Sequence, residues 1–120
     1  MIELTRGVVR FETELYPEKK AFFDKLIARQ DPKALFITCS DSRVVPNVIT
    51  DSDAGDLFTI RNAGNIVPSY GDAVGGVSAT IEYAVMALQV KNIIIVTIHV
   101  VLVVVPLYQN CLTSLKIFYC

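Results

Sequence analysis

The sequence predicts an α/β fold in which a mainly parallel β-sheet is flanked by helices. Three short apolar runs, at 34–38, 57–60 and 93–97, are rich in the β-branched and aromatic residues that are typical of buried strands. Between the last two runs, residues 77–88 have the length and composition of a helix. Strands that alternate with helices form parallel sheets through right-handed crossovers, so this order indicates the fold class.

Two helices are expected before the first strand. Apolar side chains recur at intervals of three and four residues over 3–15, which predicts an amphipathic helix. Pro17 suits the first turn of a second helix. Asp31-Pro32 ends that helix, because the residue before a proline disfavours helical backbone.

The connections between the later elements can also be assigned. Val45-Pro46 begins a short helical turn that ends near Thr50, and residues 51–55 form a loop. Residues 64–76 contain four of the six glycines, so we expect an irregular loop near a site at the strand ends. The stretch 100–105 has the composition of an aggregation-prone strand and shows no amphipathic periodicity.

Length and composition exclude several classes of protein. A chain of 120 residues is expected to form one domain, and its 11 basic and 12 acidic residues lack the basic balance of a nucleic-acid-binding protein. The apolar stretch 93–108 is shorter than the roughly 20 residues of a membrane-spanning helix. The N-terminus has no signal-peptide pattern, and the three cysteines form no disulfide framework. We therefore predict a cytoplasmic protein with no nucleic-acid or membrane partner.

The pentapeptide Cys39-Ser-Asp-Ser-Arg43 is the strongest candidate site. It directly follows the strand 34–38, at the strand end where open α/β sheets bind their ligands. In extended backbone Cys39 and Asp41 can face the same way. Zinc prefers a thiolate ligand, and Arg43 can hold the Asp41 carboxylate in a fork. A buried cysteine beside a surface Asp–Arg ion pair is an equally good interpretation of these five residues alone.

Four further segments decide between these interpretations. Together with the pentapeptide, the segments 55–58, 61–68, 75–77 and 81–85 resemble the β-class carbonic anhydrases in order and spacing. The likeness runs from about Phe11 to about Ile95 and is greatest to bacterial forms associated with cyanate metabolism. It implies a lyase that hydrates carbon dioxide reversibly to bicarbonate, requires Zn²⁺ and works as a homo-oligomer. It also implies that 1–95 is the N-terminal part of that fold and that 96–120 is a divergent tail.

The resemblance assigns roles to individual residues. Cys39 corresponds to the first zinc ligand. Asp41 and Arg43 correspond to a catalytic dyad, in which Asp41 orients the attacking water or, when released by Arg43, binds the metal itself.

The resemblance also assigns three substrate-binding residues. Gln30 corresponds to a glutamine that donates hydrogen bonds to a substrate oxygen. Phe58 and Tyr83 correspond to aromatic walls of the carbon dioxide cleft, often across a dimer interface. Without the resemblance, Gln30 is a surface residue at a helix end and the two aromatic residues belong to the core. Arg61 and Asn62 are expected to brace the glycine-rich loop.

The pattern departs from the family after the third strand. The remaining zinc ligands should come as His-x-x-Cys, but His99 is followed three residues later by Leu102 and lies one residue late. His99 is therefore a displaced candidate ligand, and we predict a truncated chain without activity. In a shifted reading frame, Thr97-Ile98 can encode histidine and Val100-Val101 can encode cysteine, three codons apart. This favours a frame-shifted tail; the alternative is a metal-free, non-catalytic module that dimerises or binds a partner.

Overall fold

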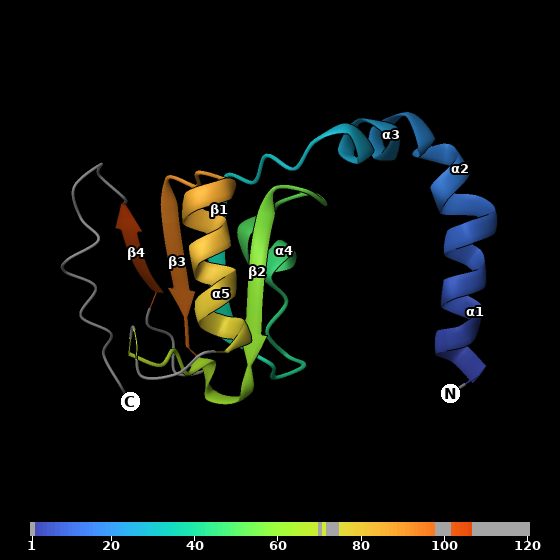
Figure 1. Ribbon diagram of the computed structural model, residues 1–120. Helices are drawn as coiled ribbons and strands as arrows, with labels where there is room; N and C mark the ends of the chain where they lie inside the picture. The colour runs from blue at the N-terminus through green and yellow to red at the C-terminus, as the bar shows by residue number, and fades with distance from the viewer. Residues whose placement is uncertain (1, 70, 72–74, 98–101, 107–120) are drawn as a thin grey trace. The chain divides into compact units, whose positions relative to one another are not determined.

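The computed structural model describes residues 2–69, 71, 75–97 and 102–106. The chain divides into two compact units, Met1–Gln30 and Asp31–Cys120, and each is described by itself. Figure 1 shows the helices of the first unit and the sheet of the second.

The first unit is helical throughout. It contains α1 (Ile2–Arg10), the π-helical turn η1 (Phe11–Leu15), α2 (Tyr16–Glu18) and α3 (Lys20–Ala28). The predicted boundary at Pro17 is two residues early, because the helical run continues to Glu18 and breaks at Lys19 (φ −101°, ψ 14°). The wider π turn, in which the Tyr16 amide donates to the Phe11 carbonyl, accommodates the proline within the run.

None of the residues described in these helices is buried. Phe23 joins the helices through aromatic contacts, with ring centroids 5.8 Å from Phe11, 5.4 Å from Tyr16 and 5.3 Å from Phe22. Apolar side chains of α1 remain exposed, including Leu4 at 80%. The first unit therefore presents an apolar face that its own residues do not cover.

The second unit contains a four-stranded sheet in the order β2-β1-β3-β4. Its strands are β1 (Ala34–Cys39), β2 (Leu57–Asn62), β3 (Asn92–Val96) and β4 (Leu102–Pro106). The central strand β1 is parallel to both β2 and β3, whereas β4 is antiparallel to β3 (Figure 1). The α/β fold class and the three predicted strands are confirmed. The pairing of β4 was not predicted, because only a strand composition was recognised there.

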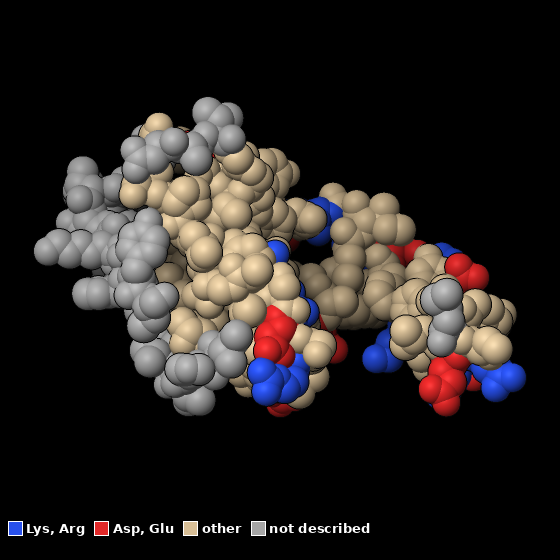
Figure 2. Space-filling model, turned by 90° about the horizontal axis from the view of Figure 1, so that it is seen from below, with Lys and Arg blue, Asp and Glu red and all other residues tan. Residues whose placement is uncertain are grey.

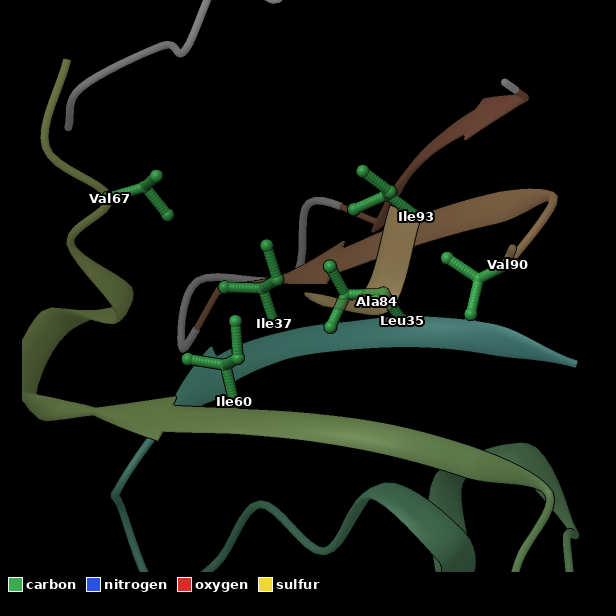
Figure 3. Packing of buried hydrophobic residues seen from close by; sticks show 7 residues of the cluster. All are labelled: Leu35, Ile37, Ile60, Val67, Ala84, Val90 and Ile93. Atoms are coloured by element: carbon green, nitrogen blue, oxygen red, sulfur yellow. The ribbon is translucent and has the colours of Figure 1, made fainter. Parts of the chain in front are cut away.

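The core of this unit is formed by the sheet and the helical segment α5 (Gly76–Glu82) with η3 (Tyr83–Ala87), and Figure 3 shows its seven buried side chains. Every residue of β1 is buried. The cluster comprises Leu35, Ile37, Ile60, Val67, Ala84, Val90 and Ile93. Ala84 is fully buried, so its small side chain lets the helix approach the sheet closely. Because β1 is packed along its whole length, its last residue, Cys39, is held in place.

The short helix α4 (Pro46–Thr50) confirms the predicted helical turn, and it ends at Asp51 in a left-handed conformation (φ 49°). No helix within the described ranges is long and apolar enough to cross a membrane.

Candidate metal centre

Cys39 ends β1 as a free thiol that is only 6% exposed. Its neighbour in the sheet is Asn62, the last residue of β2, so two parallel strands end side by side at this point. Backbone N–H groups of Asp41, Gly64 and Ser40 hydrogen-bond the sulfur and lower the pKa of the Cys39 thiol. These donors stabilise the thiolate, which is the form that binds a metal.

Asp41 and Arg43 form a two-pronged ion pair beside this thiol. Arg43 Nε donates to Asp41 Oδ1 at 2.9 Å and Nη2 donates to Oδ2 at 2.7 Å. The Arg43 backbone N–H adds a third bond to Oδ1 at 2.9 Å. The guanidinium and this backbone donor hold the pKa of the Asp41 carboxyl well below its usual range, so Asp41 is ionised at neutral pH.

The pair is unequally exposed, with the Asp41 side chain at 19% and that of Arg43 at 79%. The carboxylate is thus shielded near the sulfur, while the guanidinium extends into solvent. Figure 2 views the molecule from the end at which β2 and β3 finish, and a basic and an acidic group lie side by side there among mostly uncharged atoms.

The last two residues of β2 bind the loops around Cys39. Arg61 donates from Nε to the Cys39 carbonyl at 3.2 Å and from Nη2 to the Asp41 carbonyl at 2.8 Å. Asn62 accepts from the Ser40 N–H at 2.9 Å and donates from Nδ2 to the Ile66 carbonyl at 2.8 Å. Asn62 therefore braces the glycine-rich loop as predicted, but Arg61 braces the Cys39 loop instead.

The turn that Asn62 closes depends on glycine at one position. Gly64 has φ +72°, in the left-handed region that favours glycine. This conformation belongs to the turn Ala63–Asn65, whose Gly64 N–H is one of the donors to the Cys39 sulfur. Asn62 Oδ1 is buried and has no hydrogen-bond partner among the described residues.

Phe58 and Tyr83 contact each other, with ring centroids 5.9 Å apart, and Phe58 lies away from Cys39 along the strands. Phe58 pairs with Leu35, four residues before the level of Cys39 and Asn62. At about 3.3 Å per residue, Phe58 is therefore about 13 Å from Cys39 along the strands. Phe58 also packs against the core cluster, whereas Tyr83 is 52% exposed.

The other two predicted residues lie outside the described part of the second unit. Gln30 is exposed and follows α3 in the first unit. His99 lies outside the described residues. The structure thus brings together Cys39, Asp41 and Arg43 of the predicted set, and adds Arg61, whose role depends on strand register and could not be found from local sequence.

The donor chemistry fits one part of a zinc site. Cys39 offers a soft, stabilised thiolate, which zinc prefers. Asp41 offers a carboxylate, although Arg43 already engages both of its oxygens. No group of three or more His, Cys, Asp or Glu side chains able to hold a metal occurs within the described part of the chain. Cys39 is therefore one strong candidate ligand, and Asp41 is a second that could bind a metal only when Arg43 releases it.

Comparison with known proteins gives a consistent result. Residues 34–99 match the family model described as carbonic anhydrase. The chain is 54% identical over 95 residues to a carbonic anhydrase of Pseudomonas aeruginosa, covering 79% of this chain and 43% of the relative. It is 47% identical to one of Synechococcus elongatus, covering 79% of this chain and 35% of the relative. The chain thus spans less than half the length of these curated relatives.

Solved structures agree with the sequence matches. The β-carbonic anhydrase CcaA superposes with a TM-score of 0.73 at 49% identity, covering 78% of this chain and 42% of that chain. A tetrameric β-carbonic anhydrase of Sordaria macrospora gives a TM-score of 0.67 at 34% identity, covering 78% of this chain and 46% of that chain.

Proposed function

Because this chain belongs to the β-class carbonic anhydrase family, we propose that its site is built for zinc-dependent, reversible hydration of carbon dioxide to bicarbonate. The observation that carries the proposal is the Arg43–Asp41 fork next to the buried, stabilised thiol of Cys39. An Asp–Arg ion pair with only a structural role at the surface would not need its carboxylate to be shielded from solvent beside a stabilised thiol.

Each residue has a separate task. Zinc, when bound, acidifies a water molecule and so supplies hydroxide at neutral pH. The Cys39 thiolate would hold the metal. Asp41 Oδ would accept a hydrogen bond from the attacking water and fix its orientation, because its low pKa keeps it an acceptor. Arg43 would keep Asp41 away from the metal, since both carboxylate oxygens are bonded to the guanidinium.

Substrate binding supports a homo-oligomer. Gln30, Phe58 and Tyr83 are the proposed substrate-binding residues, but Phe58, which contacts Tyr83, lies about 13 Å along the strands from Cys39 in one chain. A cleft that combines them with Cys39 therefore needs a second copy. The exposed apolar face of the first unit is a further surface available for association. A cytoplasmic location and the cyanate-associated subtype remain part of this proposal.

The sequence after β3 limits the activity of this chain. We propose that 96–120 is a divergent, frame-shifted tail and that the chain has no turnover, because Leu102 occupies the place of a cysteine ligand and His99 is displaced. The second candidate function is a metal-free dimerising or interaction module of the same fold, and the observation that favours it is Leu102 at the place of a cysteine ligand.

The experiment compares this chain with a version whose reading frame is corrected near codon 96 and continued into the natural downstream sequence. Zinc is measured by metal analysis after dialysis, and hydration by stopped-flow with a pH indicator. We expect weak, substoichiometric zinc and no rate for the present chain, and one zinc with rapid hydration for the corrected chain. A corrected chain that holds zinc without any rate above buffer would favour the non-catalytic module.

A further inference from the structure

Arg61 uses its guanidinium on two main-chain carbonyls of the Cys39 loop. Its Nε bonds the Cys39 carbonyl at 3.2 Å and its Nη2 bonds the Asp41 carbonyl at 2.8 Å. These carbonyls belong to the residues before and after Ser40. Because a guanidinium is planar and rigid, holding both at once fixes the orientation of the two peptide groups relative to each other.

This arrangement fixes the peptide groups that carry the two carbonyls. With both carbonyls bonded to Arg61, the Ser40 N–H donates to the Asn62 carbonyl at 2.9 Å. The Asp41 N–H belongs to the peptide group between the two that Arg61 holds, and its hydrogen bonding lowers the pKa of the Cys39 thiol. A second bond to the Asp41 carbonyl, from the Val44 N–H at 3.0 Å, closes the turn that carries Arg43. Arg43 therefore holds the side chain of Asp41, while Arg61 holds its main chain.

We infer that Arg61 is a positioning residue of the metal centre, which presents the Cys39 thiolate and the Asp41 carboxylate together without touching the metal. The inference rests on the proposed function and deepens it. Arg61 itself is exposed, so it contributes little to the core. Its loss should therefore change how the ligands are presented more than it changes the stability of the sheet.

The test uses the full chain with Cys111→Ser and Cys120→Ser, so that Cys39 is the one remaining thiol. Cadmium ion alone is titrated, and the thiolate-to-cadmium charge-transfer absorption reports binding by Cys39. We expect Arg61→Gln to weaken cadmium affinity by about tenfold or more, the range found for groups that orient metal ligands. Arg61→Lys should fail to restore it, because an ammonium group cannot bond both carbonyls in the same geometry.

Lys33→Gln is the matched control. It removes one positive charge at the opposite end of β1, where Lys33 Nζ pairs with Asp56 at 2.8 Å. Its cadmium affinity should equal that of the parent. Far-UV circular dichroism of every variant checks that the fold is retained.

Each result has a definite meaning. Parent-like affinity in Arg61→Gln overturns the positioning role. Full recovery in Arg61→Lys, or an equal loss in Lys33→Gln, shows that charge alone acts and also overturns it. If the parent itself gives no thiolate band, the assignment of Cys39 as metal ligand fails, and the proposed function fails with it.

Discussion

Replacement of Ile37 by valine tests whether the buried strand β1 carries the stability of the sheet unit. Ile37 is 2% exposed and belongs to the core cluster under the helical segment α5–η3. The change removes one methylene group and leaves a small void, which costs about 0.5–1.5 kcal/mol in a packed core. Since almost the whole side chain is buried, we expect a loss of about 1 kcal/mol in the free energy of unfolding.

The assay is urea unfolding followed by far-UV circular dichroism, because the chain has no tryptophan. With a denaturant slope of about 2 kcal/mol per M, the midpoint should fall by about 0.5 M. Ile49→Val is the matched control, since it makes the same chemical change at a side chain of α4 that is 53% exposed. It should change the stability by less than about 0.5 kcal/mol. Equal midpoint shifts in the two variants would refute the assignment of β1 as the packed centre.

Four other outcomes are expected. Cys39→Ser should abolish zinc binding in the frame-corrected chain, and zinc retained by this variant in metal analysis would contradict the ligand assignment. Asp41→Asn should keep the metal and slow hydration, which stopped-flow measures. Lys33, and then the Asp53 N–H, lower the pKa of Asp56, so its stabilising contribution is present above the ordinary carboxyl pKa and is lost as pH falls through the lower folded value. Asp56→Asn should therefore show a smaller fall in urea midpoint below about pH 4 than the parent. The uncovered apolar faces should make the chain associate at micromolar concentration, and a monomer by light scattering would be the contrary result.

The parts of the fold that were predicted are those whose signal is local. The composition of β1 and the charged pentapeptide after it are contiguous in sequence, so both the strand and the position of Cys39 could be assigned. Asp41 and Arg43 are two residues apart, and their fork needs no tertiary information. The helix break was misplaced because a π turn before Pro17 lets the helical run continue to Glu18.

The parts that were missed depend on register between distant segments. Arg61 reaches Cys39 because β2 pairs with β1 so that Asn62 is opposite Cys39, and no local pattern specifies that pairing. The same register separates Phe58 from Cys39 along the strands, although both residues resemble members of one site. The antiparallel pairing of β4 with β3 likewise follows from a reversal of chain direction that composition does not encode.

The geometry around Cys39 does not depend on the residues that depart from the family pattern. Cys39 is fixed by the packing of β1, its loop by Arg61 and Asn62 from β2, and Asp41 by its own neighbour Arg43. The contacts of the Cys39 loop come from residues 39–66, and β1 itself also pairs with β3 as far as Val96. A change of sequence after Val96 can therefore remove zinc ligands and leave this half of the centre preformed. The ordered Cys39 thiol and the Asp41–Arg43 pair therefore belong to a part of the site that residues before β3 position.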